Sequence, residues 1–80
     1  MITSSQINPT ESSNLLGFGY NKESKQLGVV FKSSPNSLYI YSNVPESLYE
    51  DMENAESKGS FFYNNFRKTK WEFIITPFEV

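Results

Sequence analysis

Segments of alternating apolar and polar residues lie in the first half of the chain, over residues 15–20, 26–32 and 38–41. Alternation with a period of two is typical of β-strands that bury one face. Polar segments rich in turn-forming residues, 21–25 and 33–36, separate them. Because both connections have hairpin length, the pattern predicts a three-stranded antiparallel meander.

The first predicted strand carries glycine at alternate positions. Gly17 and Gly19 stand between the apolar residues Leu16, Phe18 and Tyr20. Glycine inside a strand often marks a place where another group comes very close to the backbone. We therefore expect another backbone or side chain to lie against this strand.

The predicted sheet carries apolar side chains on both faces. Neighbouring apolar residues, such as Val29–Val30 and Ile40–Tyr41, must point to opposite sides of their strand. A half-buried antiparallel sheet usually keeps one face polar. We expect the C-terminal segment or another subunit to cover the second face, which favours a homodimer or a partner complex.

A helix is predicted directly after the third strand. Asn43 and Glu46 have the spacing of a capping box, with Pro45 in the first turn. Gly59 is expected to end this helix in the left-handed conformation. The apolar residues that follow at helical spacing are Val44, Leu48, Met52 and Ala55.

A second short helix and a further strand are predicted nearer the C-terminus. Ser60 is placed to cap a helix in which Phe62 and Phe66 lie one turn apart. Residues 71–76 alternate again, and Pro77 stops them. The predicted fold class is α+β: a three-stranded antiparallel meander packed on one main helix, with a short second helix and a C-terminal strand or extended tail.

A chain of 80 residues is enough for one small domain. We interpret residues 1–11 as a flexible N-terminal arm or an edge-pairing tail. Residues 12–80 then form the single domain, with a C-terminal extension from about residue 72. The absence of cysteine excludes disulfides and thiolate metal sites and fits a cytoplasmic location. We find no signal-peptide pattern and no apolar run of membrane-spanning length, so no membrane association is expected.

Charge is unevenly distributed along the chain. The net charge is −2, and acidic residues concentrate within residues 46–56. A negative net charge argues against a protein that coats nucleic acid in general, but it is compatible with a local basic surface. The acidic stripe is interpreted as a solvated helix face, because carboxylates on an exposed helix rarely converge on a metal. The basic residues that follow it are Lys58, Arg67, Lys68 and Lys70.

The first candidate site is the pair Tyr39 and Tyr41. One interpretation places both tyrosines in the core, against the helix face of Leu48 and Met52. The other makes them a stacking platform for a base, as in proteins that bind single strands.

The second candidate site is the basic and aromatic segment that ends at Trp71. Basic side chains interleaved with aromatic rings suit RNA or a nucleotide, because charge contacts phosphate and rings stack on bases. The alternative is an ordinary solvated face that balances the acidic helix. The candidate ligand-binding residues are Tyr39, Tyr41, Lys58, Arg67, Lys68, Lys70 and Trp71.

Catalysis is not expected. The chain has no histidine to act as a base near neutral pH and no cysteine nucleophile. Its serines lie in no nucleophile elbow. We therefore predict a protein that is not an enzyme and that uses neither a cofactor nor a metal.

An ordered set of short motifs runs from Ser12 to about Trp71. Its pieces are Ser12–Leu15, Gly19–Asn21, Leu27-x-Val29-x-Phe31, Tyr39-Ile40-Tyr41, Val44-Pro45 with Tyr49, Ala55–Gly59, and Phe61, Phe62, Phe66 and Arg67. In this order they resemble the KTSC domain, a small module found at the C-terminus of some lysyl-tRNA synthetases and as stand-alone bacterial and phage proteins. Tyr63 and Phe66 depart from the family pattern. The resemblance implies RNA binding, through the association with the synthetase.

Two hypotheses for function follow. The first is a non-enzymatic module that binds RNA or a nucleotide through the aromatic and basic residues named above. The alternative is a stand-alone interaction protein, of the kind that phages encode, which inhibits a host protein or sequesters a signalling nucleotide in the host cytoplasm.

Overall fold

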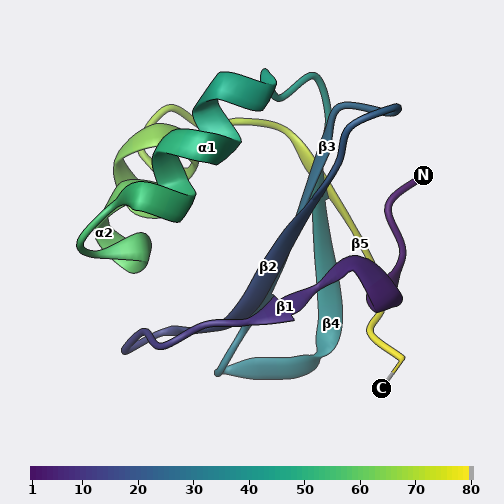
Figure 1. The fold of residues 1–80 in the computed structure, drawn as a ribbon. Coiled ribbons are helices and arrows are strands. Elements are labelled where there is room, and N and C mark those ends of the chain that lie inside the picture. Colours follow the sequence, from purple (N-terminus) through teal and green to yellow (C-terminus); the bar gives the residue numbers. More distant parts are fainter. Residues whose placement is uncertain (80) are drawn as a thin grey trace.

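The computed structural model describes residues 1–79 as an antiparallel sheet with its two α-helices on one side (Figure 1). The strands are β1 (Asn8–Pro9), β2 (Leu15–Asn21), β3 (Gln26–Phe31), β4 (Ser34–Tyr41) and β5 (Phe73–Pro77), and they neighbour one another in sequence order. The helical elements are the 3₁₀ turn η1 (Ser4–Gln6), α1 (Glu46–Asn54), α2 (Lys58–Phe62) and the π-helical turn η2 (Tyr63–Arg67). This confirms the predicted α+β class and meander. Within residues 1–79, no helix is long and apolar enough to span a membrane.

The sheet separates two apolar cores. The larger core lies between the sheet and the helices and is formed by Leu15, Phe18, Leu27, Val29, Tyr41, Val44, Met52, Phe62 and Phe66. The smaller core, on the other face, is formed by Ile2, Val30, Leu38 and Ile40, with Ile7 and Phe78 packed against it. The chain's own two ends therefore cover the second face, the C-terminal segment as expected and the N-terminal segment in addition.

Residues 1–11 lie against the sheet. Asn8 and Pro9 pair with Phe18 and Gly17 of β2, and Ile2 is only 3% exposed. This arrangement corresponds to the edge-pairing alternative rather than to a free arm. The expected close approach at the glycines is confirmed, because a Cβ added at Gly17 would lie 2.5 Å from the Asn8 carbonyl oxygen.

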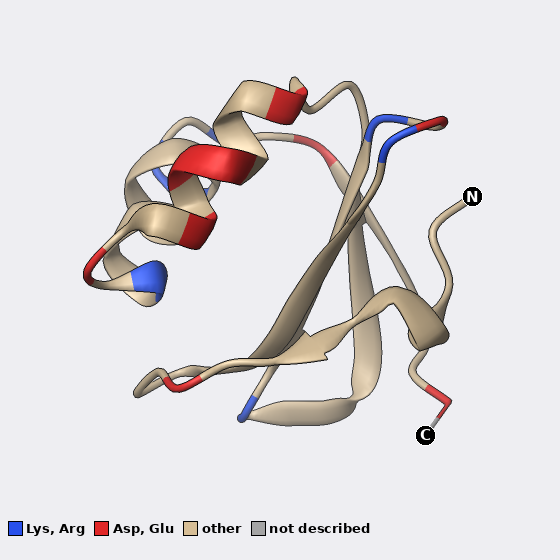
Figure 2. Ribbon diagram, viewed as in Figure 1, with Lys and Arg blue, Asp and Glu red and all other residues tan. Residues whose placement is uncertain are grey.

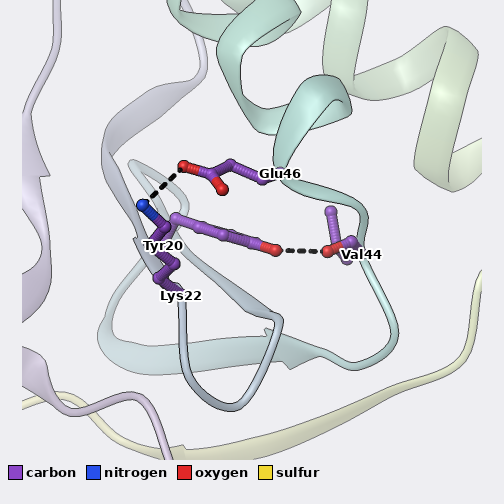
Figure 3. Close-up of polar contacts among 4 residues, drawn as sticks. All are labelled: Tyr20, Lys22, Val44 and Glu46. Atoms are coloured by element: carbon purple, nitrogen blue, oxygen red, sulfur yellow. Dashed lines mark hydrogen bonds and ion pairs between the residues drawn. The ribbon is translucent and has the colours of Figure 1, made fainter.

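The start of α1 differs from the predicted capping box. Asn43 adopts a left-handed conformation, with φ of 60°, and the helix begins at Glu46 with Pro45 as its N-cap residue and no side-chain cap. Asn43 therefore stands two residues before the N-cap position and does not cap the helix. The β2–β3 hairpin fixes this junction instead: the Tyr20 hydroxyl donates a hydrogen bond to the Val44 carbonyl, and an exposed Lys22–Glu46 ion pair lies beside it (Figure 3).

The predicted helix boundary at Gly59 and Ser60 is also wrong. α1 ends at Asn54, and Gly59 lies inside α2 without a positive φ. Ser57, not Ser60, caps α2, because its Oγ accepts a hydrogen bond of 3.2 Å from the Ser60 amide. The reason for glycine at 59 is space: a Cβ there would lie 2.7 Å from Oδ1 of Asn14.

Candidate functional site

A groove of about 1090 Å³ opens between the end of η2 and the sheet, on the face that carries the larger core. It brings together segments that are far apart in the sequence. Its lining residues are Ser13, Asn14, Phe31, Lys32, Ser33, Tyr39, Tyr41, Phe66, Arg67, Lys70, Trp71, Glu72 and Phe73. The two candidate sites predicted separately therefore meet in one groove.

The two tyrosines play different parts in this groove. Tyr41 is 3% exposed, and its ring packs 5.4 Å from Phe62 and 5.3 Å from Phe73 between centroids. Burial raises the pKa of Tyr41 to about 12, and the nearby positive charge of Arg67 opposes that rise. Tyr39 is half-buried and lies 5.4 Å from Phe73. Tyr41 is thus a core residue at the floor of the groove, whereas Tyr39 lies between the rings of Phe31, 4.9 Å away, and Phe73, and stays partly exposed.

Arg67 is the last residue of the π-helical turn η2 and lines the groove. η2 runs from Tyr63 to Arg67, and Phe66 within it is 1% exposed in the core. The next residue, Arg67, is exposed and lines the groove. Such π-turns occur frequently at functional sites. Because Arg67 directly follows the buried Phe66, the packing of Phe66 in the core fixes the backbone position of Arg67.

Lys70 occupies a backbone position that favours glycine. Its φ is 58°, its amide donates to the Arg67 carbonyl at 3.1 Å, and the Trp71 amide donates to the Phe66 carbonyl at 2.9 Å. This is a Schellman motif, and the contact between the Phe66 and Trp71 rings, 4.9 Å apart, is its usual hydrophobic partner. A non-glycine residue in this conformation is strained. Lys25 and Asn43, which do not line the groove, adopt it as well.

We predict that Lys70→Gly stabilises the fold by about 1 kcal/mol, because glycine adopts this conformation without a steric penalty. Lys25→Gly is the matched control, since Lys25 has φ of 56° in the β2–β3 turn and lies outside the groove. Urea denaturation of both variants measures the effect. Similar gains at both positions are expected. A loss of stability on Lys70→Gly would show that the lysine side chain itself supports the fold.

Trp71 is held rigidly at the edge of the groove. Its indole Nε1 donates a hydrogen bond of 2.9 Å to the Ser42 carbonyl, at the end of β4. The ring also packs on Phe66 and stays half-buried. A fixed, partly exposed indole is suited to stacking, because little side-chain entropy is lost when a ligand binds.

Two of the candidate residues lie outside the groove. The Lys58 ammonium donates a hydrogen bond of 2.9 Å to the Ala55 carbonyl, near the end of α1, and faces a separate hollow beside Tyr49 and Glu53. Lys68 is exposed but does not line the groove. Conversely, sequence reasoning missed Lys32, which enters from the β3–β4 turn and whose amide donates to the Asn14 carbonyl.

The charge around the groove is opposite in sign to that of the whole chain. Lys32, Arg67 and Lys70 line it against the single carboxylate of Glu72, whereas the net charge of the protein is −2. Acidic residues gather instead along α1 (Figure 2). In residues 1–79 no group of acidic side chains is arranged to hold a metal ion. The local field therefore favours an anionic ligand in the groove.

Comparison with known proteins gives consistent results. The KTSC domain family model matches residues 11–69. A lysine–tRNA ligase from Nostoc punctiforme is 41% identical over 63 residues, which is 79% of this chain but only 11% of that protein. The crystal structure of a KTSC domain protein from Yersinia pestis superposes with a TM-score of 0.74 and 29% identity, covering 90% of this chain and 94% of the other. The chain therefore corresponds to a small part of the ligase and to nearly all of the Yersinia domain.

Proposed function

We propose that this chain, which belongs to the KTSC domain family, is a non-catalytic module that binds single-stranded RNA in the groove. The supporting observation is the lining of that groove. Arg67 and Lys70 are placed to contact phosphates, while Tyr39 and Trp71 offer ring surface to bases. Single-strand binders combine these two features in the same way, with a positive groove that follows the backbone and aromatic side chains on which bases stack.

The layout of the groove favours a strand over a free nucleotide. In sites for small molecules, a few polar groups usually converge on the ligand. Here the aromatic and cationic groups spread over β4, β5 and the end of η2, rather than converging on one point. A short stretch of RNA suits this layout better than a single nucleotide does.

The relative from Nostoc punctiforme supports the choice of RNA. It is named a lysine–tRNA ligase, and the matching region makes up 11% of it. A small region within a protein that acts on tRNA is well placed to contact RNA. The ligase reaction itself is not carried over to this chain.

Binding is measurable without a label, because Trp71 is the only tryptophan of the chain and lines the groove. We predict that single-stranded oligoribonucleotides quench its fluorescence, with an affinity that falls steeply as salt rises. Arg67→Ala is expected to weaken binding about tenfold and to lower the salt dependence by roughly one counterion. Duplex RNA should bind more weakly, since its bases are not available for stacking.

Lys22→Ala is the control for this measurement. It removes the same charge from the β2–β3 turn, where Lys22 pairs with the exposed Glu46. We expect its affinity to stay close to that of the original protein. Unchanged Trp71 fluorescence at low salt, or equal losses in Arg67→Ala and Lys22→Ala, would contradict the proposal. Tighter binding of free mononucleotides than of RNA strands would identify a mononucleotide, instead of RNA, as the ligand.

A further inference from the structure

The two edges of the sheet are protected to very different degrees. At one edge, β1 is two residues long and includes Pro9, which cannot donate a hydrogen bond. At the other edge lies β5, with Phe73 48%, Ile74 52% and Ile75 54% exposed. Proteins normally blunt sheet edges with short strands, prolines or charges, and an apolar edge strand invites pairing. Within the described residues, β5 is the edge that remains open.

The hydrogen-bond pattern shows which backbone groups β5 presents outward. The Phe78 amide donates to the Asn36 carbonyl at 2.8 Å, and the next pair, Ser37 and Pro77, has no amide proton at Pro77. Hydrogen-bonded and non-hydrogen-bonded pairs alternate in an antiparallel ladder. Ile75, which pairs with Tyr39, and Phe73, which pairs with Tyr41, therefore occupy non-hydrogen-bonded positions. Their amide and carbonyl groups point away from β4.

We propose that β5 pairs with β5 of a second copy of this chain, antiparallel, with Ile74 on the two-fold axis. In this register the outward groups of Phe73 bond reciprocally with those of Ile75 in the second copy. Ile74 then faces its own equivalent across a non-hydrogen-bonded pair, where side chains approach most closely. Pro77 limits a shift of the register toward the C-terminus, because it offers no outward amide.

A second copy fits this edge better than an unrelated strand does. The same apolar run, Phe73–Ile75, supplies both sides, and each exposed side chain meets another apolar one. Glu72 faces Thr76 of the second copy, so no like charges oppose each other in the ladder. The contact is small compared with the 800 Å² or so per partner of a stable complex, so the dimer is expected to be reversible.

The dimer would also place both grooves on the same face of one continuous sheet. A two-fold axis perpendicular to an antiparallel sheet keeps equivalent faces on one side. Phe73 contributes both to the groove and to the paired edge. This arrangement concerns the groove that we propose to bind RNA, but the pairing itself does not depend on any ligand.

Sedimentation velocity from micromolar to millimolar protein tests the association. We expect a concentration-dependent dimer that Ile74→Lys abolishes, because it places like charges face to face. Leu16→Lys is the matched control, since Leu16 is also an exposed apolar residue, 40% exposed, but lies on β2. It should leave the dimer intact. A strict monomer at every concentration, or equal loss in both variants, would overturn the proposal.

A cysteine placed on the axis tests the register. The chain has no cysteine of its own, so Ile74→Cys introduces one thiol per copy. Opposed residues of a non-hydrogen-bonded pair have Cα atoms about 4.5 Å apart, within the range of a disulfide. With oxidised glutathione, we expect Ile74→Cys to form a covalent dimer and Thr76→Cys, which is displaced along the ladder, to remain monomeric. Equal cross-linking at both positions would refute this register.

Discussion

Phe62→Ala is expected to remove about 3–5 kcal/mol of folding free energy, the cost of emptying a buried phenylalanine site. An 80-residue domain has a total stability of only about 4–12 kcal/mol, so the variant should be largely destabilised. Phe62 is 2% exposed and lies at the centre of an aromatic cluster. Its ring is 5.4 Å from those of Phe31 and Tyr41, and 5.3 Å from that of Phe66.

Urea denaturation followed by far-ultraviolet circular dichroism measures this loss. Phe61→Ala is the matched control, because it makes the same chemical change at the preceding residue, which is only partly buried against the core. We expect Phe61→Ala to lose less than half as much stability. Similar losses in the two variants would contradict the central role of Phe62. Phe62→Leu should restore most of the stability, since it refills the cavity.

The core helix–sheet contact was predictable because it rests on local periodicity. Alternation located the strands, and the spacing of Phe62 and Phe66 placed both rings on one helical face. In the structure these two rings are stacked, with their centroids 5.3 Å apart. Periodicity carries no information on how segments distant in sequence meet, however. The convergence of Tyr39, Arg67 and Trp71 on one groove therefore appears only in three dimensions.

The errors at the helix boundaries share a physical cause. Residue type alone predicts helix ends at Asn43, Gly59 and Ser60, because each is common there. At Gly59 the deciding factor is a tertiary one: Asn14, from the loop before β2, needs the space that a side chain would fill. At Asn43 the preference for left-handed backbone prevailed over the preference for capping. A single sequence does not indicate which of two local preferences will dominate.

Lys32 and Lys70 show how far the site can be predicted from the sequence. Lys32 stands in the β3–β4 turn, far in sequence from the basic segment, so nothing local marks it as a neighbour of Arg67. The charge of Lys70 predicts it as a candidate, but its left-handed backbone belongs to the Schellman motif after η2, which no local pattern indicates.

Gly19→Ala is expected to release residues 1–9 from the sheet. A Cβ at position 19 would overlap the carbonyl oxygen of Gln6, a backbone atom that cannot rotate away. The loss should amount to about 2–4 kcal/mol, because the burial of Ile2 and the pairing of β1 with β2 disappear together. The loss of folding free energy is limited to this amount, because the overlap between residue 19 and Gln6 disappears once residues 1–9 have separated from the sheet. Gly28→Ala is the control: its nearest neighbour is the flexible end of the Ile7 side chain, so a smaller loss is expected.

A double-mutant cycle separates release of the segment from a general weakening of β2. Ile2→Ala alone should cost about 2–4 kcal/mol, because Ile2 is almost fully buried in the smaller core. If Gly19→Ala has already released the segment, Ile2 is exposed to water and its truncation costs almost nothing further. Urea denaturation of both single variants and the double variant measures this coupling. Additive losses would mean that the segment stays bound and that β2 itself absorbs the overlap at Gly19.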